Sequence, residues 1–123
     1  HKDSNRPRRV AELIKRELAM IIPREFDDPS AHKITLTGAE VSPDLSNARV
    51  YFSVLGGAAE APAVTKALNR AAGFFRHALR DHMSLKRGVP HLRFYFDESL
   101  ERGARLDSLI ERAVAEDKQH PHE

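Results

Sequence analysis

The sequence predicts an α+β domain in which amphipathic helices pack on one face of a small three-stranded sheet. Two kinds of segment lead to this prediction. Some stretches repeat apolar residues every three or four positions, as helices do, and shorter ones alternate apolar with polar residues, as strands do. Their order along the chain is α-β-β-α-α-β-α. The chain has 123 residues, of which 41% are hydrophobic, enough for one domain with its own core. We expect a flexible segment at 1–6, the domain at 7–116 and a disordered tail at 117–123.

The first helix is predicted over residues 7–22. Pro7 suits a first helical turn, where a missing amide costs nothing, and Ser4 or Asn5 could cap that turn. Pro23 is expected to end or kink the helix. The apolar side chains have the spacing of one buried stripe, formed by Val10, Leu13, Ile14, Leu18, Ile21 and Ile22.

Three strands are predicted, the first two joined as an antiparallel hairpin. Residues 33–41 are rich in β-forming residues, and Gly38 predicts a bulge where their alternation slips by one. The "SPDLS" sequence at 42–46 is typical of a turn. Residues 48–55 and 91–97 then alternate cleanly, which predicts one buried face. The side chains expected on that face are Ala48, Val50, Phe52 and Val54, followed by Leu92, Phe94 and Phe96.

A long helical pattern occupies residues 63–87 and contains a glycine, Gly73, near its middle. Gly88 and Pro90 are expected to stop it. Residues 98–116 predict a last helix. The long pattern has one apolar stripe, made by Val64, Leu68, Ala72, Phe75, Leu79 and Met83, and a different face that carries Lys66, Arg70, Gly73, His77 and Arg80.

Gly73 has three interpretations, and each must offset the roughly 0.5–1 kcal/mol that a mid-helix glycine costs relative to alanine. It could be a local break that turns Phe74 and Phe75 into the core. It could instead let a phosphate backbone approach the main chain, as the Gly-rich turn of KH domains does. The third interpretation is a helix-turn-helix of a DNA-binding regulator with residues 75–86 as recognition helix. The short "AAG" linker disfavours that alternative.

Charge is distributed in blocks that the net charge of +2 hides. Residues 1–24 hold seven Lys or Arg and three acids, residues 66–93 hold seven and one, and the two other blocks are acidic. Two basic blocks predict one positive face that attracts nucleic acid. The predicted RNA-binding residues are Arg6, Arg8, Arg9, Lys15 and Arg16 on the first helix, with Lys66, Arg70, Gly73, Arg76, Arg80, Lys86 and Arg87 around the glycine.

Aromatic residues available for base stacking are few. The phenylalanines fit core positions, and only Tyr51 and Tyr95 fall on the opposite face of the strands. This pattern predicts recognition of RNA shape and backbone more than of base sequence. The core phenylalanines expected are Phe52, Phe74, Phe75, Phe94 and Phe96.

Nothing in the sequence indicates an enzyme, a metal site or a cofactor. His77 and His82 lie five residues apart, about 140° around a helix, and so do not share a face. Adjacent Asp27 and Asp28 are more typical of a loop or capping device than of a nuclease site. The chain has no cysteine, which fits a reducing cytoplasm, and no apolar run long enough to span a membrane.

The sequence resembles the bacterial ribosome-binding factor A family. Four stretches in order carry this resemblance: "RPRRVAELIKREL", "FDDP", "VSPDLSNARVYFSVL" and "LNRAAGFFRHALRDHMSLKRGVPHLRFYFDESLERGARLDSLI". Together they cover nearly the whole chain. The family replaces the Gly-x-x-Gly turn of KH domains by an interhelical Ala-x-Gly kink, and Ala71, Ala72 and Gly73 match it.

The resemblance implies a single KH-like (type II) domain and a non-catalytic ribosome-assembly factor. Such a factor binds the free small (30S) ribosomal subunit and its 16S rRNA, assists late maturation that includes 16S rRNA 5′-end processing, and matters most in the cold. The resemblance further implies a cytoplasmic monomer that a ribosome-assembly GTPase releases from the subunit. It implies no cofactor and no membrane.

Overall fold

The computed structural model describes residues 2–83 and 88–98. The predicted tail at 117–123, nearly all of the predicted last helix at 98–116, and the predicted site residues Lys86 and Arg87 lie outside these ranges. The described elements, in order, are α1 (Lys2–Glu25), a 3-10 turn (Ala31–Lys33), β1 (Ile34–Val41), β2 (Asn47–Val54), a second 3-10 turn (Gly57–Ala59), α2 (Ala61–Arg70), α3 (Ala72–His82) and β3 (His91–Phe96).

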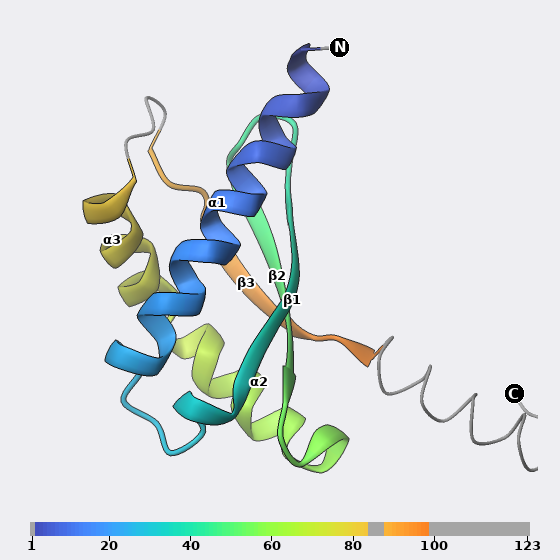
Figure 1. Cartoon of the computed structure of the whole chain (residues 1–123), viewed down its shortest axis with the longest axis vertical. Helices are drawn as coiled ribbons and strands as arrows, with labels where there is room; N and C mark the ends of the chain where they lie inside the picture. The colour runs from blue at the N-terminus through green and yellow to red at the C-terminus, as the bar shows by residue number, and fades with distance from the viewer. Residues whose placement is uncertain (1, 84–87, 99–123) are drawn as a thin grey trace, which may run out of the picture.

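The three strands form one sheet in the order β1-β2-β3, and the helices lie on one side of it (Figure 1). β1 and β2 are antiparallel, while β2 and β3 are parallel. A parallel pair needs a crossover connection, which α2 and α3 provide here. This is the α+β, KH-like order predicted from the sequence, and that prediction is confirmed.

The core lies between the sheet and the helices. Alternate residues of β2 and β3 are buried, as the sequence predicts, because a strand covered on one face hides every second side chain. The apolar side chains of the helices pack against these buried strand residues. The largest fully buried side chains come from every layer and are Ile14, Leu18, Ile22, Val50, Phe52, Leu68, Phe75, Leu79 and Phe94.

The β1–β2 hairpin follows the sequence prediction closely. The register shifts between Leu36 and Gly38, which confirms the bulge. In the turn, Asp44 Oδ1 accepts hydrogen bonds from the hydroxyls of Ser46 and Ser42, both at 2.7 Å. These bonds, that from Ser46 first, lower the pKa of Asp44 to about 2, because they stabilise the carboxylate.

The helix boundaries differ from the predicted ones. α1 begins at Lys2, so Pro7 lies inside the helix, and the prediction that Ser4 or Asn5 caps it is wrong. The helix also continues past Pro23 to Glu25. A proline keeps a helical φ and removes only one hydrogen bond, and the buried Ile21 and Ile22 hold this last turn in place. The division of the chain into mobile and folded segments stays a prediction.

The second helical region also ends earlier than expected. α3 stops at His82, six residues before Gly88, where Met83 turns to an extended conformation with φ −123° and ψ 139°. Met83 is buried there and anchors the C-terminal end of α3 to the core. Packing, rather than the glycine and proline that follow, therefore ends α3.

Candidate nucleic-acid interface

The break between α2 and α3 falls on Ala71. Its φ of −91° and ψ of 4° leave the helical region, and its amide donates to the carbonyl oxygens of both Ala67 and Leu68 at 3.1 Å. The amide of Phe75 then donates to the Ala71 carbonyl at 3.0 Å, which begins α3. The predicted kink is therefore present, but its bent residue is an alanine two positions before the glycine.

Gly73 lies in the first turn of α3 and is exposed. A Cβ added to Gly73 would meet nothing within 4 Å, and its φ is not positive. Neither packing nor backbone conformation within the described chain requires a glycine there. The interpretation of Gly73 itself as the break is wrong, whereas open space over its main chain remains compatible with close approach of a ligand.

Asn69 ties the end of α2 to the sheet, and sequence reasoning missed it. Its side-chain Nδ2 donates to the Phe94 carbonyl at 3.0 Å, and its Oδ1 accepts from the Phe94 amide at 2.8 Å. The side-chain amide of Asn69 thus makes the pair of hydrogen bonds with the edge of β3 that a neighbouring strand would make. Asn69 precedes the break by two residues, so the bond pair fixes where the helices bend relative to the sheet. The only feature of the sequence that could have indicated this role is the presence of an amide side chain in the last turn of an amphipathic helix.

The basic residues of α2 and α3 are mostly free to contact a ligand. Lys66, Arg70 and Arg80 are exposed, as is Gly73 between them. Arg76 differs, because it is half-buried and its Nε donates to the Val89 carbonyl at 2.9 Å. That bond fastens α3 to the segment before β3, so Arg76 has a structural role as well.

The basic residues of α1 form a second group. Arg6, Arg8, Arg9 and Arg16 are exposed and Lys15 is half-buried. The first turns of α1 extend beyond the sheet at the end of the molecule opposite α2 (Figure 1). The structure therefore does not gather all predicted residues into one compact site. They fall into two groups, one along α1 and one beside the α2–α3 break.

The prediction that Phe74 lies in the core is wrong. Its side chain is 49% exposed, while its neighbour Phe75 is fully buried and packs edge-on against it at 5.7 Å between ring centroids. Two consecutive residues of a helix point about 100° apart, so both cannot face the sheet. Phe74 lines a hollow of about 380 Å³ with Arg70 and Ala71, and thus places an aromatic ring beside the break.

Acidic residues line the same hollow. Asp27 and Asp28 lie in the loop after α1, and Asp28 Oδ1 accepts hydrogen bonds from the Ser30 hydroxyl at 2.6 Å and the Ser30 amide at 2.9 Å. These bonds lower the pKa of Asp28, the hydroxyl contributing most. The prediction of a loop-capping role for this acidic pair is confirmed for Asp28.

Other kinds of site receive no support from the described residues. Within 2–83 and 88–98, no three histidine or acidic side chains gather as metal ligands would. In the same ranges, no helix has both the length and the apolar character needed to cross a bilayer. The described residues beside the α2–α3 break offer exposed cations, and Asp27 and Asp28 line the adjoining hollow.

Comparisons with known proteins agree with one another. A family model described as ribosome-binding factor A matches residues 6–110. A relative of that name from Thioalkalivibrio sulfidiphilus is 50% identical over 98% of this chain and 93% of its own length. Another from Pseudomonas fluorescens is 48% identical over 98% and 92%.

Solved structures show the same fold. The crystal structure of ribosome-binding factor A from Thermus thermophilus has a TM-score of 0.62 at 26% identity, covering 72% of this chain and 93% of its own. A homology model of the Thermus protein, fitted into the cryo-EM map of a complex with the 30S subunit, has a TM-score of 0.59 at 25% identity over 72% and 91%. On its sequence and its fold, the chain belongs to the ribosome-binding factor A family.

Proposed function

We propose that this protein is a non-catalytic ribosome-assembly factor that binds the free 30S subunit through 16S rRNA. The observation that carries the proposal is the α2–α3 junction, where Gly73 leaves open space over a helix start and Lys66, Arg70 and Arg80 are exposed around it. The start of a helix favours anions, because its first amides point outward and the helix dipole is positive there. No side chain caps the start of α3. A family member fitted into a 30S complex supports the choice of partner.

The contacts that we propose are mainly to phosphate. The exposed cations would release counterions from the rRNA backbone, so affinity should fall steeply as salt rises. The α1 group would extend the same contact along the subunit. Phe74 adds one ring for stacking beside the break, which a purely electrostatic surface would lack.

The finer parts of the proposal follow the family resemblance. They comprise late maturation with 16S rRNA 5′-end processing, importance in the cold, release by a ribosome-assembly GTPase, and action as a cytoplasmic monomer without cofactor. A helix-turn-helix regulator is not proposed, since one residue, Ala71, separates the helices and the buried stripe of α3 faces the core.

Co-sedimentation with purified 30S subunits over a range of salt concentrations tests this function. We expect the unaltered protein to bind at low salt and the Arg70→Glu, Arg80→Glu double variant to bind at least about tenfold more weakly, because phosphate contacts are lost and repulsions added. Lys33→Glu is the control, since Lys33 is also exposed but lies in the 3-10 turn before β1, outside both basic groups. Equal losses in variant and control, or no binding at any salt concentration, would contradict the proposal.

A further inference from the structure

The sheet face opposite the helices carries a cluster that the proposed interface does not use. We call it the open sheet face and define it by Glu40 on β1, Arg49 and Tyr51 on β2, and Arg93 and Tyr95 on β3. The residues of β2 and β3 in this cluster alternate with buried neighbours, and the exposed Glu40 is paired with Arg49 in the strand register, so the described helices do not cover this face. A face that only needed to be soluble would not require two tyrosines there.

The strand register places like residues side by side. In the parallel β2–β3 pair, Arg49 is opposite Arg93 and Tyr51 is opposite Tyr95. The two tyrosine rings lie 5.7 Å apart between centroids with planes inclined by 33°, and Tyr95 is 38% exposed. Like charges directly opposite each other destabilise a sheet, so an arginine pair at this position favours an anion between them.

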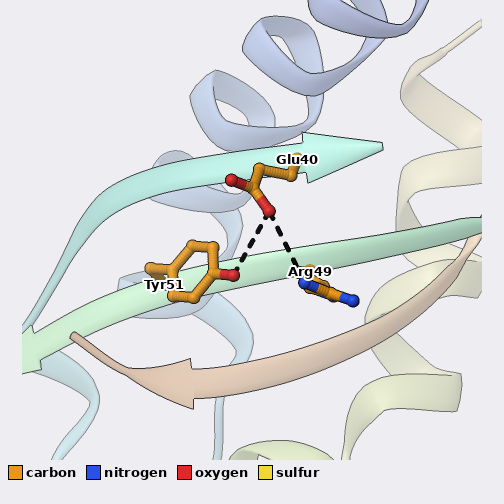
Figure 2. Close-up of polar contacts among 3 residues, drawn as sticks. All are labelled: Glu40, Arg49 and Tyr51. Atoms are coloured by element: carbon orange, nitrogen blue, oxygen red, sulfur yellow. Dashed lines mark hydrogen bonds and ion pairs between the residues drawn. The ribbon is translucent and has the colours of Figure 1, made fainter. Parts of the chain in front are cut away.

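One carboxylate partly neutralises this pair in the free protein. Glu40 Oε1 lies 3.8 Å from Arg49 Nη1 and accepts a hydrogen bond from the Tyr51 hydroxyl at 3.3 Å (Figure 2). The side chains of Arg49 and Glu40 are 63% and 67% exposed, so this ion pair is weak and displaceable. Within the described ranges, Arg93 has no ion-pair partner at all.

The same residues border a hollow. Its volume is about 730 Å³, within the range of sites that hold small ligands, and Arg49, Arg93, Tyr95 and His91 line it. Glu40 also lines it, so the hollow combines exposed aromatic surface with two arginines whose charge one carboxylate only partly offsets. A base of any type can stack on an aromatic ring, and cations beside the ring can contact the phosphates of the nucleic-acid backbone.

We propose that the open sheet face binds an unstacked nucleotide of single-stranded RNA, with its base on Tyr95 and its phosphate between Arg49 and Arg93. In the free protein the Glu40 carboxylate pairs with Arg49. On binding, the RNA phosphate displaces the carboxylate from Arg49. This contact lies on the face opposite the helices and is additional to the one proposed at the α2–α3 break. It depends on the proposed function only in taking RNA as the ligand.

Fluorescence anisotropy with a short labelled single-stranded RNA tests the inference on the full chain. Tyr95→Ala should weaken binding at least about fivefold through lost stacking, and Arg93→Glu by a similar factor or more. Tyr95→Phe keeps the ring and should stay within about twofold. Glu40→Gln should strengthen binding by about two- to threefold, because it removes the competing carboxylate. The same strand annealed to its complement should bind without sensitivity to Tyr95→Ala.

Each other outcome overturns the inference. Unchanged affinity in both Tyr95→Ala and Arg93→Glu, or an equal loss in the Lys33→Glu control, would show that the face does not bind RNA. A dimer in analytical ultracentrifugation that Arg93→Glu converts to monomer would assign the face to a second copy of the chain. Arg70→Glu should weaken 30S binding and leave Tyr95-dependent oligonucleotide binding in place, so the two proposals can fail separately.

Discussion

Two regions of this molecule contrast in how their helices respond to residues that disfavour helix. α1 contains Pro7 and Pro23 and yet runs unbroken from Lys2 to Glu25. The second helical region contains no proline after Pro62, at its start, and still breaks at Ala71, one of the best helix-forming residues. Tertiary contacts therefore outweigh intrinsic propensity in both places.

The difference lies in what each helix must reach. α1 packs one continuous stripe, from Val10 to Ile22, against the sheet, so a straight course buries all of it. α2 and α3 must instead bury Leu68 and Phe75 while Asn69 holds the edge of β3. In the structure the bend at Ala71 occurs together with the burial of both side chains and with the Asn69 bond pair to β3.

The largest effect expected from this comparison is at Asn69. Asn69→Ala leaves both the amide and the carbonyl of Phe94 without their partner, which should cost about 1–3 kcal/mol in the free energy of unfolding. Urea denaturation measures the loss. Hydrogen exchange should also accelerate at the Phe94 amide, since Asn69 Oδ1 is its acceptor.

Lys66→Ala is the control for this change. Lys66 is exposed on the same helix, so its removal should alter stability by no more than about 0.5 kcal/mol. If the Phe94 amide exchanges equally fast in the Asn69→Ala variant and the unaltered protein, the bond pair does not fix the helix break.

A smaller effect, of opposite sign, is expected in α1. Pro23→Ala supplies an amide for the Ala19 carbonyl and should stabilise the protein by about 1 kcal/mol, the restored helical bond outweighing the greater freedom of the unfolded chain. Thermal and urea denaturation measure it. Pro29→Ala, in the loop after α1, gains no helical bond and should be neutral or slightly destabilising. A destabilised Pro23→Ala would mean that the proline fixes the end of α1.

The same contrast explains what the sequence could predict. Apolar periodicity identified every described helix and strand, the bulge before Gly38 and nearly all of the core, because burial leaves a repeating pattern. It misplaced the helix boundaries at Pro7, Pro23 and Gly88, because these depend on contacts between distant residues. Residue type placed Lys66, Arg70 and Arg80 on an exposed face, whereas the bond of Arg76 to Val89 and the exposure of Phe74 required the three-dimensional arrangement.

The smallest expected change in stability is at Gly73, and it separates the fold from the function. A Cβ at this position meets nothing within 4 Å, so Gly73→Ala should stabilise the protein by about 0.5–1 kcal/mol, the ordinary gain of alanine in a helix. If rRNA phosphate approaches the start of α3 closely, the same methyl group should weaken 30S binding in co-sedimentation. Ala78→Gly, later in α3, is the reverse control: it should cost stability and leave 30S affinity unchanged. A stabilised Gly73→Ala that binds as tightly as the unaltered protein would leave the glycine without a role in close approach, and binding would then rest on the surrounding cations alone.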